Sequence, residues 1–233
     1  SAFSQSFFTK IYKKDKNFHN FYKFYIDTIC NIFNFVGINI NTVPVLDVMR
    51  LKSHSIIGSR SFSSDADLVS KIGKICIDLH KVNKIFTIVK HIPGHGLSRD
   101  DSHKKLPIVS ASKSDLIKKD FKPFKDSNSL FAMTAHVVFS KYDPFFCATH
   151  SKKIIKDVIR KHIGFKGILI SDDISMKALK LGIKKNATMA LEAGCNLVLH
   201  CNGRINEMKE LARVIPRIDA FTQKKTSDFY KFL

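Results

Sequence analysis

The sequence I-F-T-I-V-K-H-I-P-G-H-G-L-S-R-D-D-S-H-K-K-L-P, residues 85–107, joins a short apolar run to a polar loop. The β-branched and apolar residues at 85–89 predict a buried strand that ends at Lys90 and His91. Proline and glycine at 93–96 then end regular structure and begin a loop, which carries His95, Asp100, Asp101 and His103. So many ionisable groups at the end of a buried strand are typical of a functional site.

The same succession of strand, loop and helix recurs along the chain. We predict buried strands at 38–48, 85–89, 132–139, 167–173 and 196–201, and helices at 1–36, 65–82, 112–124, 151–162, 187–193 and 206–215. Ser64 is the expected N-cap of the helix that begins at residue 65. This alternation predicts a parallel sheet whose strands are covered on both faces.

Polar residues stand at the carboxyl ends of these predicted strands. They are Asp47, Lys90, His91, His136, Asp172, Asp173 and His200. Active sites of (β/α)8 TIM-type barrels lie at that end of the strands, so the pattern predicts such a barrel and places its site. We identify five strands, whereas a complete barrel has eight.

Composition narrows the class of protein. The chain has 233 residues, 44% hydrophobic and 25% charged, which is typical of a folded globular domain. The net charge of +19 would suggest a nucleic-acid partner, but the lysines are spread over the whole chain, so we expect none. Five cysteines without a C-x-x-C pair indicate reduced thiols and a cytoplasmic protein, and no apolar run is long enough to span a membrane.

Two pairs of residues could carry proton transfer or nucleophilic chemistry. Asp172 and Asp173 end an apolar strand; one of them could cap the next helix, which would leave the other for chemistry, because neighbouring strand residues point to opposite sides. Asp101 and His103 are close enough for a carboxylate–imidazole pair that transfers protons. The alternative for this second pair is two solvated loop residues.

Other interpretations of the histidines remain open. His91 and His95 could bind a metal ion together with His103 and Asp172, as in a metal-dependent barrel hydrolase, although the proline and glycine between them exclude a helical arrangement. His136 and His200 are expected to be hydrogen-bonded structural residues or walls of a pocket. Lys90 leaves a buried strand and therefore needs a carboxylate or the hydroxyl groups of a ligand.

Several of these segments together resemble a known family. They are K-H-I-P-G-H-G at 90–96, D-S-H at 101–103, G-F-K-G-I-L-I-S-D-D-I-S-M at 164–176, P-V-L-D-V at 44–48, G-S-R-S-F-S at 58–63 and A-M-T-A-H-V-V at 132–138. In this combination and order they resemble the glycoside hydrolase family 3 β-N-acetylhexosaminidases, bacterial enzymes that remove N-acetylglucosamine from cell-wall fragments during peptidoglycan recycling. The resemblance covers about residues 37–203.

The resemblance implies a role for each of six residues. Asp172 corresponds to the nucleophile that forms a covalent glycosyl-enzyme, and His103 to the general acid/base, with Asp101 as its partner. Arg60, Lys90 and His91 correspond to residues that bind the sugar. The family implies a retaining exo-β-N-acetylglucosaminidase that acts on muropeptides without metal or cofactor. We expect its partner to be a small glycan, and the protein to be a monomer.

The chain departs from the family pattern in two places. The family's D-R-S-F occurs here as Ser59-Arg60-Ser61-Phe62, without the acidic neighbour of the arginine. The family also begins with two further strand–helix units, and we expect this chain to lack them. We therefore expect one partial catalytic barrel over residues 1–216 and a loosely ordered basic tail over 217–233. A truncated, non-catalytic sugar-binding remnant is the alternative.

Overall fold

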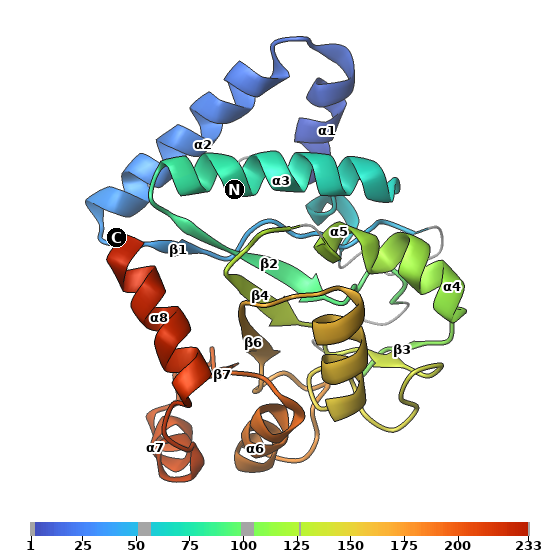
Figure 1. Cartoon of the computed structure of the whole chain (residues 1–233), viewed down its shortest axis with the longest axis vertical. Coiled ribbons are helices and arrows are strands. Elements are labelled where there is room, and N and C mark those ends of the chain that lie inside the picture. The colour runs from blue at the N-terminus through green and yellow to red at the C-terminus, as the bar shows by residue number, and fades with distance from the viewer. Residues whose placement is uncertain (1–2, 51–56, 99–104, 126, 233) are drawn as a thin grey trace.

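A computed structural model describes residues 3–50, 57–98, 105–125 and 127–232. Five parallel strands form one sheet in the order β1-β2-β4-β6-β7, so strands that follow one another in this sheet are neighbours. Their bounds are β1 (Ile40–Asn41), β2 (Phe86–Ile92), β4 (Phe131–Thr134), β6 (Ile168–Asp173) and β7 (Leu197–Leu199). Among the described residues the sheet stays open (Figure 1). The α/β fold with a partial barrel sheet is confirmed.

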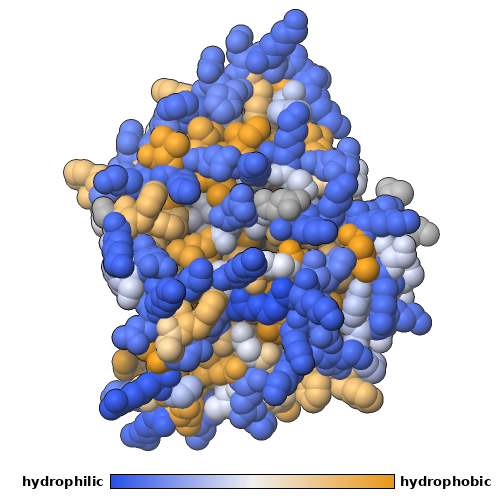
Figure 2. Space-filling model, viewed as in Figure 1, coloured by the Kyte–Doolittle hydropathy of each residue, from blue (hydrophilic) through white to orange (hydrophobic). Residues whose placement is uncertain are grey.

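Helices connect the strands and cover the sheet. They are α1 (Gln5–Lys14), α2 (Phe18–Phe35), α3 (Ala66–Val82), α4 (Lys113–Asp115), η2 (Leu116–Asp120), α5 (Lys122–Lys125), η3 (Ile154–His162), α6 (Ile183–Ala193), α7 (Ile205–Val214) and α8 (Ala220–Phe232), with a single turn η1 (Gly58–Arg60). A second, two-stranded sheet pairs β3 (Ile108–Val109) with β5 (Val138–Phe139). No helix in the described part of the chain is long and apolar enough to cross a membrane. On the face shown in Figure 2, hydrophilic side chains predominate and hydrophobic ones form scattered patches between them.

Four local predictions were wrong in detail. The strand predicted at 38–48 is limited to the two residues of β1. The predicted helix at 1–36 is two helices, because the Asp15 carboxylate accepts the amide hydrogen of Asn17 (2.8 Å) and this local bond competes with the helix. The predicted strand at 132–139 is split between β4 and β5. The N-cap of α3 is Asp65 and not Ser64, since Asp65 Oδ1 accepts the amides of Asp67 (2.9 Å) and Leu68 (3.3 Å).

The C-terminal segment is helical where we expected a loosely ordered tail. Phe229 of α8 is buried against Phe86 and Phe131. The centroid of its ring lies 4.7 Å from that of Phe86 and 5.6 Å from that of Phe131. Phe232 lies one turn further along the helix and packs edge-on against Phe86. Because α8 thereby covers a face of the sheet that would otherwise meet water, apolar burial orders this basic segment. The domain division at residue 216 stays a prediction.

Candidate active site

Four of the six residues singled out in the sequence lie around one pocket. Arg60 from η1, Lys90 and His91 from β2, and Asp172 from β6 line a cavity of about 420 Å³ at the carboxyl ends of the strands. The other lining residues are Thr42, Ile57, His95, Met133, Leu199 and Cys201. Asp101 and His103 lie outside the described residues. The parallel sheet thus brings together side chains that are more than a hundred residues apart in the sequence.

The two carboxylates at the end of β6 have different surroundings. Asp173 Oδ1 accepts the backbone amides of Ser175 (3.0 Å) and Cys201 (3.1 Å), and both of its oxygens accept from the Ser175 hydroxyl. Asp173 therefore anchors the turn after β6 to the end of β7. Asp172 points into the pocket, and its Oδ1 accepts the amide hydrogen of Asp173 (2.8 Å). Of the two, Asp172 is the carboxylate available to a ligand.

The surroundings of Asp172 keep its carboxyl group ionised. Burial by itself raises its pKa, but the imidazoles of His91 and His136 and the amide of Asp173 outweigh burial and lower the pKa below the usual range. An ionised, largely buried carboxylate at the wall of a pocket can act as a nucleophile or stabilise a developing positive charge.

Asp47 supports this site from behind the pocket wall, and sequence reasoning placed it at a strand end without giving it a role. It is fully buried, and its Oδ2 accepts the Nδ1 proton of His91 (2.6 Å), while its Oδ1 accepts the backbone amides of His91 (3.2 Å) and His95 (2.7 Å). Burial raises the pKa of Asp47, and the contacts with His91 and His95 lower it overall. Its place in the P-V-L-D-V segment, near the end of a predicted strand, was the available signal.

This anchoring fixes the loop that begins after β2. With Nδ1 of His91 bound to Asp47, the opposite edge of the ring, which carries Nε2, is left for the pocket. His95 packs edge-on against His91, with ring centroids 5.6 Å apart. Burial and the neighbouring His91 lower the pKa of His95 to about 4, so this ring is neutral at pH 7. Gly96 is required here, because a Cβ at this position would lie 1.8 Å from the carbonyl oxygen of Val48.

Two cationic side chains line the pocket with Asp172. Burial and the nearby Arg60 lower the pKa of Lys90, while Asp172 and Asp47 act in the opposite direction. A lysine so placed is a hydrogen-bond donor for hydroxyl groups, and the arginine adds a planar donor group. Together with Asp172 they can hold a polar, hydroxyl-rich ligand.

His136 and His200 are structural, in accord with one of the two expectations. His136 is fully buried, and burial lowers its pKa; its Nε2–H donates to the carbonyl oxygen of Asp173 (3.0 Å) and its Nδ1 accepts from the Thr149 hydroxyl (2.7 Å). His200 bonds Glu207 of α7 through Nε2 (2.8 Å). His136 thus supports the end of β6, and His200 fastens the end of β7.

The metal-site interpretation of the histidines has no support in the described part of the chain. No three His, Cys, Asp or Glu side chains among residues 3–50, 57–98, 105–125 and 127–232 lie close enough together to hold a metal ion. His103, a member of that predicted ligand set, lies outside these residues.

Known proteins resemble this chain in sequence. Residues 28–227 match the glycosyl hydrolase family 3 N-terminal domain. The chain is 34% identical to a beta-hexosaminidase of Nitrosomonas eutropha over 171 residues, which cover 71% of this chain and 49% of that protein. It is 37% identical to a beta-hexosaminidase of Tolumonas auensis over 174 residues, 72% of this chain and 51% of that one. The chain spans about half the length of the curated relatives it matches.

Solved structures share the fold. NagZ from Neisseria gonorrhoeae in complex with N-trifluoroacetyl-D-glucosamine superposes with a TM-score of 0.86 at 27% identity, covering 97% of this chain and 66% of that chain. A family 3 β-N-acetylglucosaminidase from Paenibacillus sp. superposes with a TM-score of 0.78 at 28% identity. The superposition covers 89% of this chain and 42% of that chain. Sequence and fold agree over most of the molecule, and the chain belongs to glycoside hydrolase family 3.

Proposed function

We propose that this chain carries the catalytic site of a retaining exo-β-N-acetylglucosaminidase, which removes terminal N-acetylglucosamine from peptidoglycan-derived muropeptides. The observation that carries the proposal is the ionised carboxylate of Asp172 in a pocket shared with Lys90, His91 and Arg60. Relatives named beta-hexosaminidase, and a solved relative in complex with an N-acylated glucosamine, support the choice of sugar.

The first chemical step forms a covalent glycosyl-enzyme. An oxygen of the Asp172 carboxylate attacks the anomeric carbon of the sugar as the glycosidic bond breaks. The leaving oxygen takes a proton from His103, so the aglycone departs as a neutral alcohol. Asp101 accepts a hydrogen bond from the His103 ring and stabilises the protonated imidazole before the transfer.

The second step releases the sugar. His103, now neutral, accepts a proton from a water molecule, whose oxygen attacks the anomeric carbon and displaces the Asp172 carboxylate. The sugar leaves with its original anomeric configuration, and both catalytic groups return to their starting protonation states. In this scheme Lys90, Arg60 and His91 bind the hydroxyl and acetamido groups and orient the anomeric carbon over Asp172.

Hydrolysis of p-nitrophenyl β-N-acetylglucosaminide tests the proposal. We expect release of p-nitrophenol by the wild-type protein, loss of that release in Asp172→Asn, and full activity after treatment with a chelator. Mass spectrometry of the denatured reaction mixture should find the trapped sugar on the peptide that contains Asp172. No turnover by a folded protein that contains residues 1–233 would exclude the proposal, and loss of activity on chelation would favour the metal-dependent hydrolase.

A non-catalytic sugar-binding protein is the second candidate. The open, five-stranded sheet of the described residues favours it, because fewer strands surround the pocket than in a closed barrel. Titration calorimetry with N-acetylglucosamine separates the two candidates: binding without hydrolysis, abolished by Lys90→Ala, would favour the second.

We also propose a cytoplasmic, monomeric protein. The five cysteines are free thiols, which suits a reducing compartment.

A further inference from the structure

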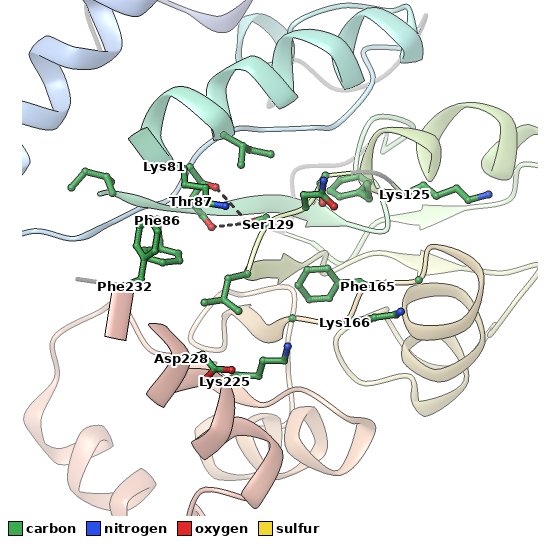
Figure 3. A pocket seen from close by; sticks show the side chains of 18 residues that line it. Lys81, Phe86, Thr87, Lys125, Ser129, Phe165, Lys166, Lys225, Asp228 and Phe232 are labelled. Carbon is green, nitrogen blue, oxygen red and sulfur yellow. Dashed lines mark hydrogen bonds between the residues drawn. The ribbon is translucent and has the colours of Figure 1, made fainter. Parts of the chain in front are cut away.

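A second pocket lies at the opposite end of the sheet from Asp172. Its cavity of about 560 Å³ is lined where β2, β4 and β6 begin, and by the facing sides of α3 and α8. The seven residues of β2 span roughly 20 Å, so this pocket is separated from the candidate active site by about the depth of the sheet. Figure 3 shows the pocket from close by. Its volume is typical of small-molecule sites in proteins.

Positive charge dominates the lining of this pocket. Lys81, Lys125, Lys166 and Lys225 approach it from α3, α5, the segment before β6 and α8, and Asp228 is the one acidic residue among the described lining. Within the part of the chain that the structure describes, none of the four lysines forms an ion pair. In Figure 3 Lys225 points from α8 into the open space, whereas Lys125 points away from it. Lys81 and Lys225, which form no ion pair in the described part of the chain, supply positive charge that attracts an anion to this cavity.

An aromatic wall faces these cations. Phe86 and Phe232 meet edge to face, with centroids 4.9 Å apart, and Phe232 remains 38% exposed. Ser127 and Asn128 lie at the same cavity and carry a hydroxyl and an amide group. A flat ring stacked on an exposed aromatic side chain gains favourable contact of about 1–3 kcal/mol in nucleic-acid complexes. The wall therefore suits a planar ring joined to the anionic group.

We propose that this pocket binds a nucleotide, with the phosphates between Lys81 and Lys225 and the base against Phe232. Inorganic polyphosphate would use the lysines but not the aromatic wall, and a free nucleoside would use the wall but not the lysines. The proposal concerns the amino-end edge of the sheet and does not depend on hydrolysis at Asp172.

The net charge of +19 makes a matched control essential, because any basic protein attracts anions without a specific site. The test variant is Lys81→Gln/Lys225→Gln. The control is Lys10→Gln/Lys209→Gln, which removes the same charge from exposed positions on α1 and α7 that do not line the pocket. A third variant, Phe232→Ala, removes the aromatic wall and leaves the charge unchanged. Circular dichroism establishes that each variant is folded.

Titration calorimetry at about 0.15 M salt, where exposed charges are largely screened, measures the binding of ATP, tripolyphosphate and adenosine. We expect one ATP per chain, a Kd raised by about tenfold or more in the Lys81/Lys225 variant, and a change below about twofold in the Lys10/Lys209 control. Phe232→Ala should weaken the binding of ATP but not the binding of tripolyphosphate. Equal weakening in both lysine variants, equal affinity of the wild type for ATP and tripolyphosphate, or no binding of ATP would overturn the proposal.

Discussion

The carboxylate of Asp47 accepts the Nδ1 proton of His91 at 2.6 Å, across 44 residues of sequence. The same carboxylate also accepts the backbone amides of His91 and His95, so one buried side chain holds both the ring and the loop that follows it. Because Asp47 is fully buried, water cannot replace these bonds. The geometry of the pocket wall therefore depends on a residue that does not itself line the pocket.

Substitution of Asp47 should destabilise the protein strongly. Asp47→Ala leaves two backbone amides and the His91 ring without their acceptor in a dry environment, and we expect a loss of about 3–5 kcal/mol in the free energy of unfolding. Urea denaturation measures this loss. The control is Asp78→Asn, an exposed aspartate on α3, which should change the free energy by less than about 0.5 kcal/mol. Similar values for the two variants would contradict the anchoring role of Asp47.

Gly96→Ala should displace the loop that carries His95. The added Cβ would lie 1.8 Å from the Val48 carbonyl oxygen, a backbone atom that cannot move without shifting its own segment. We expect destabilisation of about 2 kcal/mol or more and weaker sugar binding. Gly203→Ala is the comparison: a Cβ added there would meet no atom within 4 Å, and its φ of +70° costs about 1 kcal/mol. A smaller effect at Gly96 than at Gly203 would mean that the loop accommodates the methyl group.

Substitution of Asp172 should mainly reduce activity, whereas substitution of Asp173 should mainly reduce stability. Asp172→Asn preserves the shape of the side chain and removes its charge, so we expect turnover to fall at least about a thousandfold with little change in melting temperature. Asp173→Asn weakens the bonds to Ser175 and Cys201, and should cost about 1–3 kcal/mol of stability. Parallel kinetics and thermal unfolding measure both quantities. The reverse assignment would appear as an unstable Asp172 variant and an inactive but stable Asp173 variant.

Acid should unfold the protein through its buried histidines. Burial lowers the pKa values of His80, His95, His136 and His150, to about 4 for His95 and His150. In the unfolded chain these rings titrate near pH 6.5, so their stabilising contribution is present above that pH and is lost as the pH falls towards the folded values. We expect the melting temperature to fall between pH 7 and pH 5. His150→Gln, which keeps a donor for the Asn186 carbonyl, should reduce this dependence.

Asp120 opposes this trend. Burial raises its pKa to about 7 even though Arg50 lies 3.0 Å away, so its contribution is present at low pH and is lost as the pH rises through about 7. One carboxyl group is outweighed by four imidazoles, and the net change on acidification remains a loss of stability. A melting temperature that rises from pH 7 to pH 5 would contradict the neutral state of the buried histidines.

The C-terminal helix should contribute to stability through one aromatic residue. Phe229→Ala removes the ring that packs between Phe86 and Phe131, and we expect a loss of about 3 kcal/mol. Tyr230, the next residue on α8, is 70% exposed, and Tyr230→Ala should change stability by less than about 0.5 kcal/mol. Thermal unfolding of both variants tests whether α8 belongs to the folded core. Equal, small effects would mean that the helix is dispensable.

The sequence by itself determined the order of strands and helices and the edge at which the site lies. Apolar runs such as 85–89 and 167–171 are long enough to predict buried strands, and in a parallel sheet every carboxyl end meets the same edge. Placing Lys90, His91 and Asp172 together therefore required only local patterns and that rule. The motif resemblance contributed Arg60, whose surrounding loop has no periodic signal.

Only the tertiary structure showed what holds Asp173 away from the pocket and what holds the His91 ring. Both depend on contacts between distant segments, Asp173 with Cys201 and Asp47 with His91, and no local pattern encodes such pairs. The C-terminal segment likewise forms the ordered helix α8 because of contacts with distant residues. Its lysines suggested a solvated tail, and Phe229 orders it because Phe86 and Phe131, about a hundred or more residues earlier, offer an apolar surface.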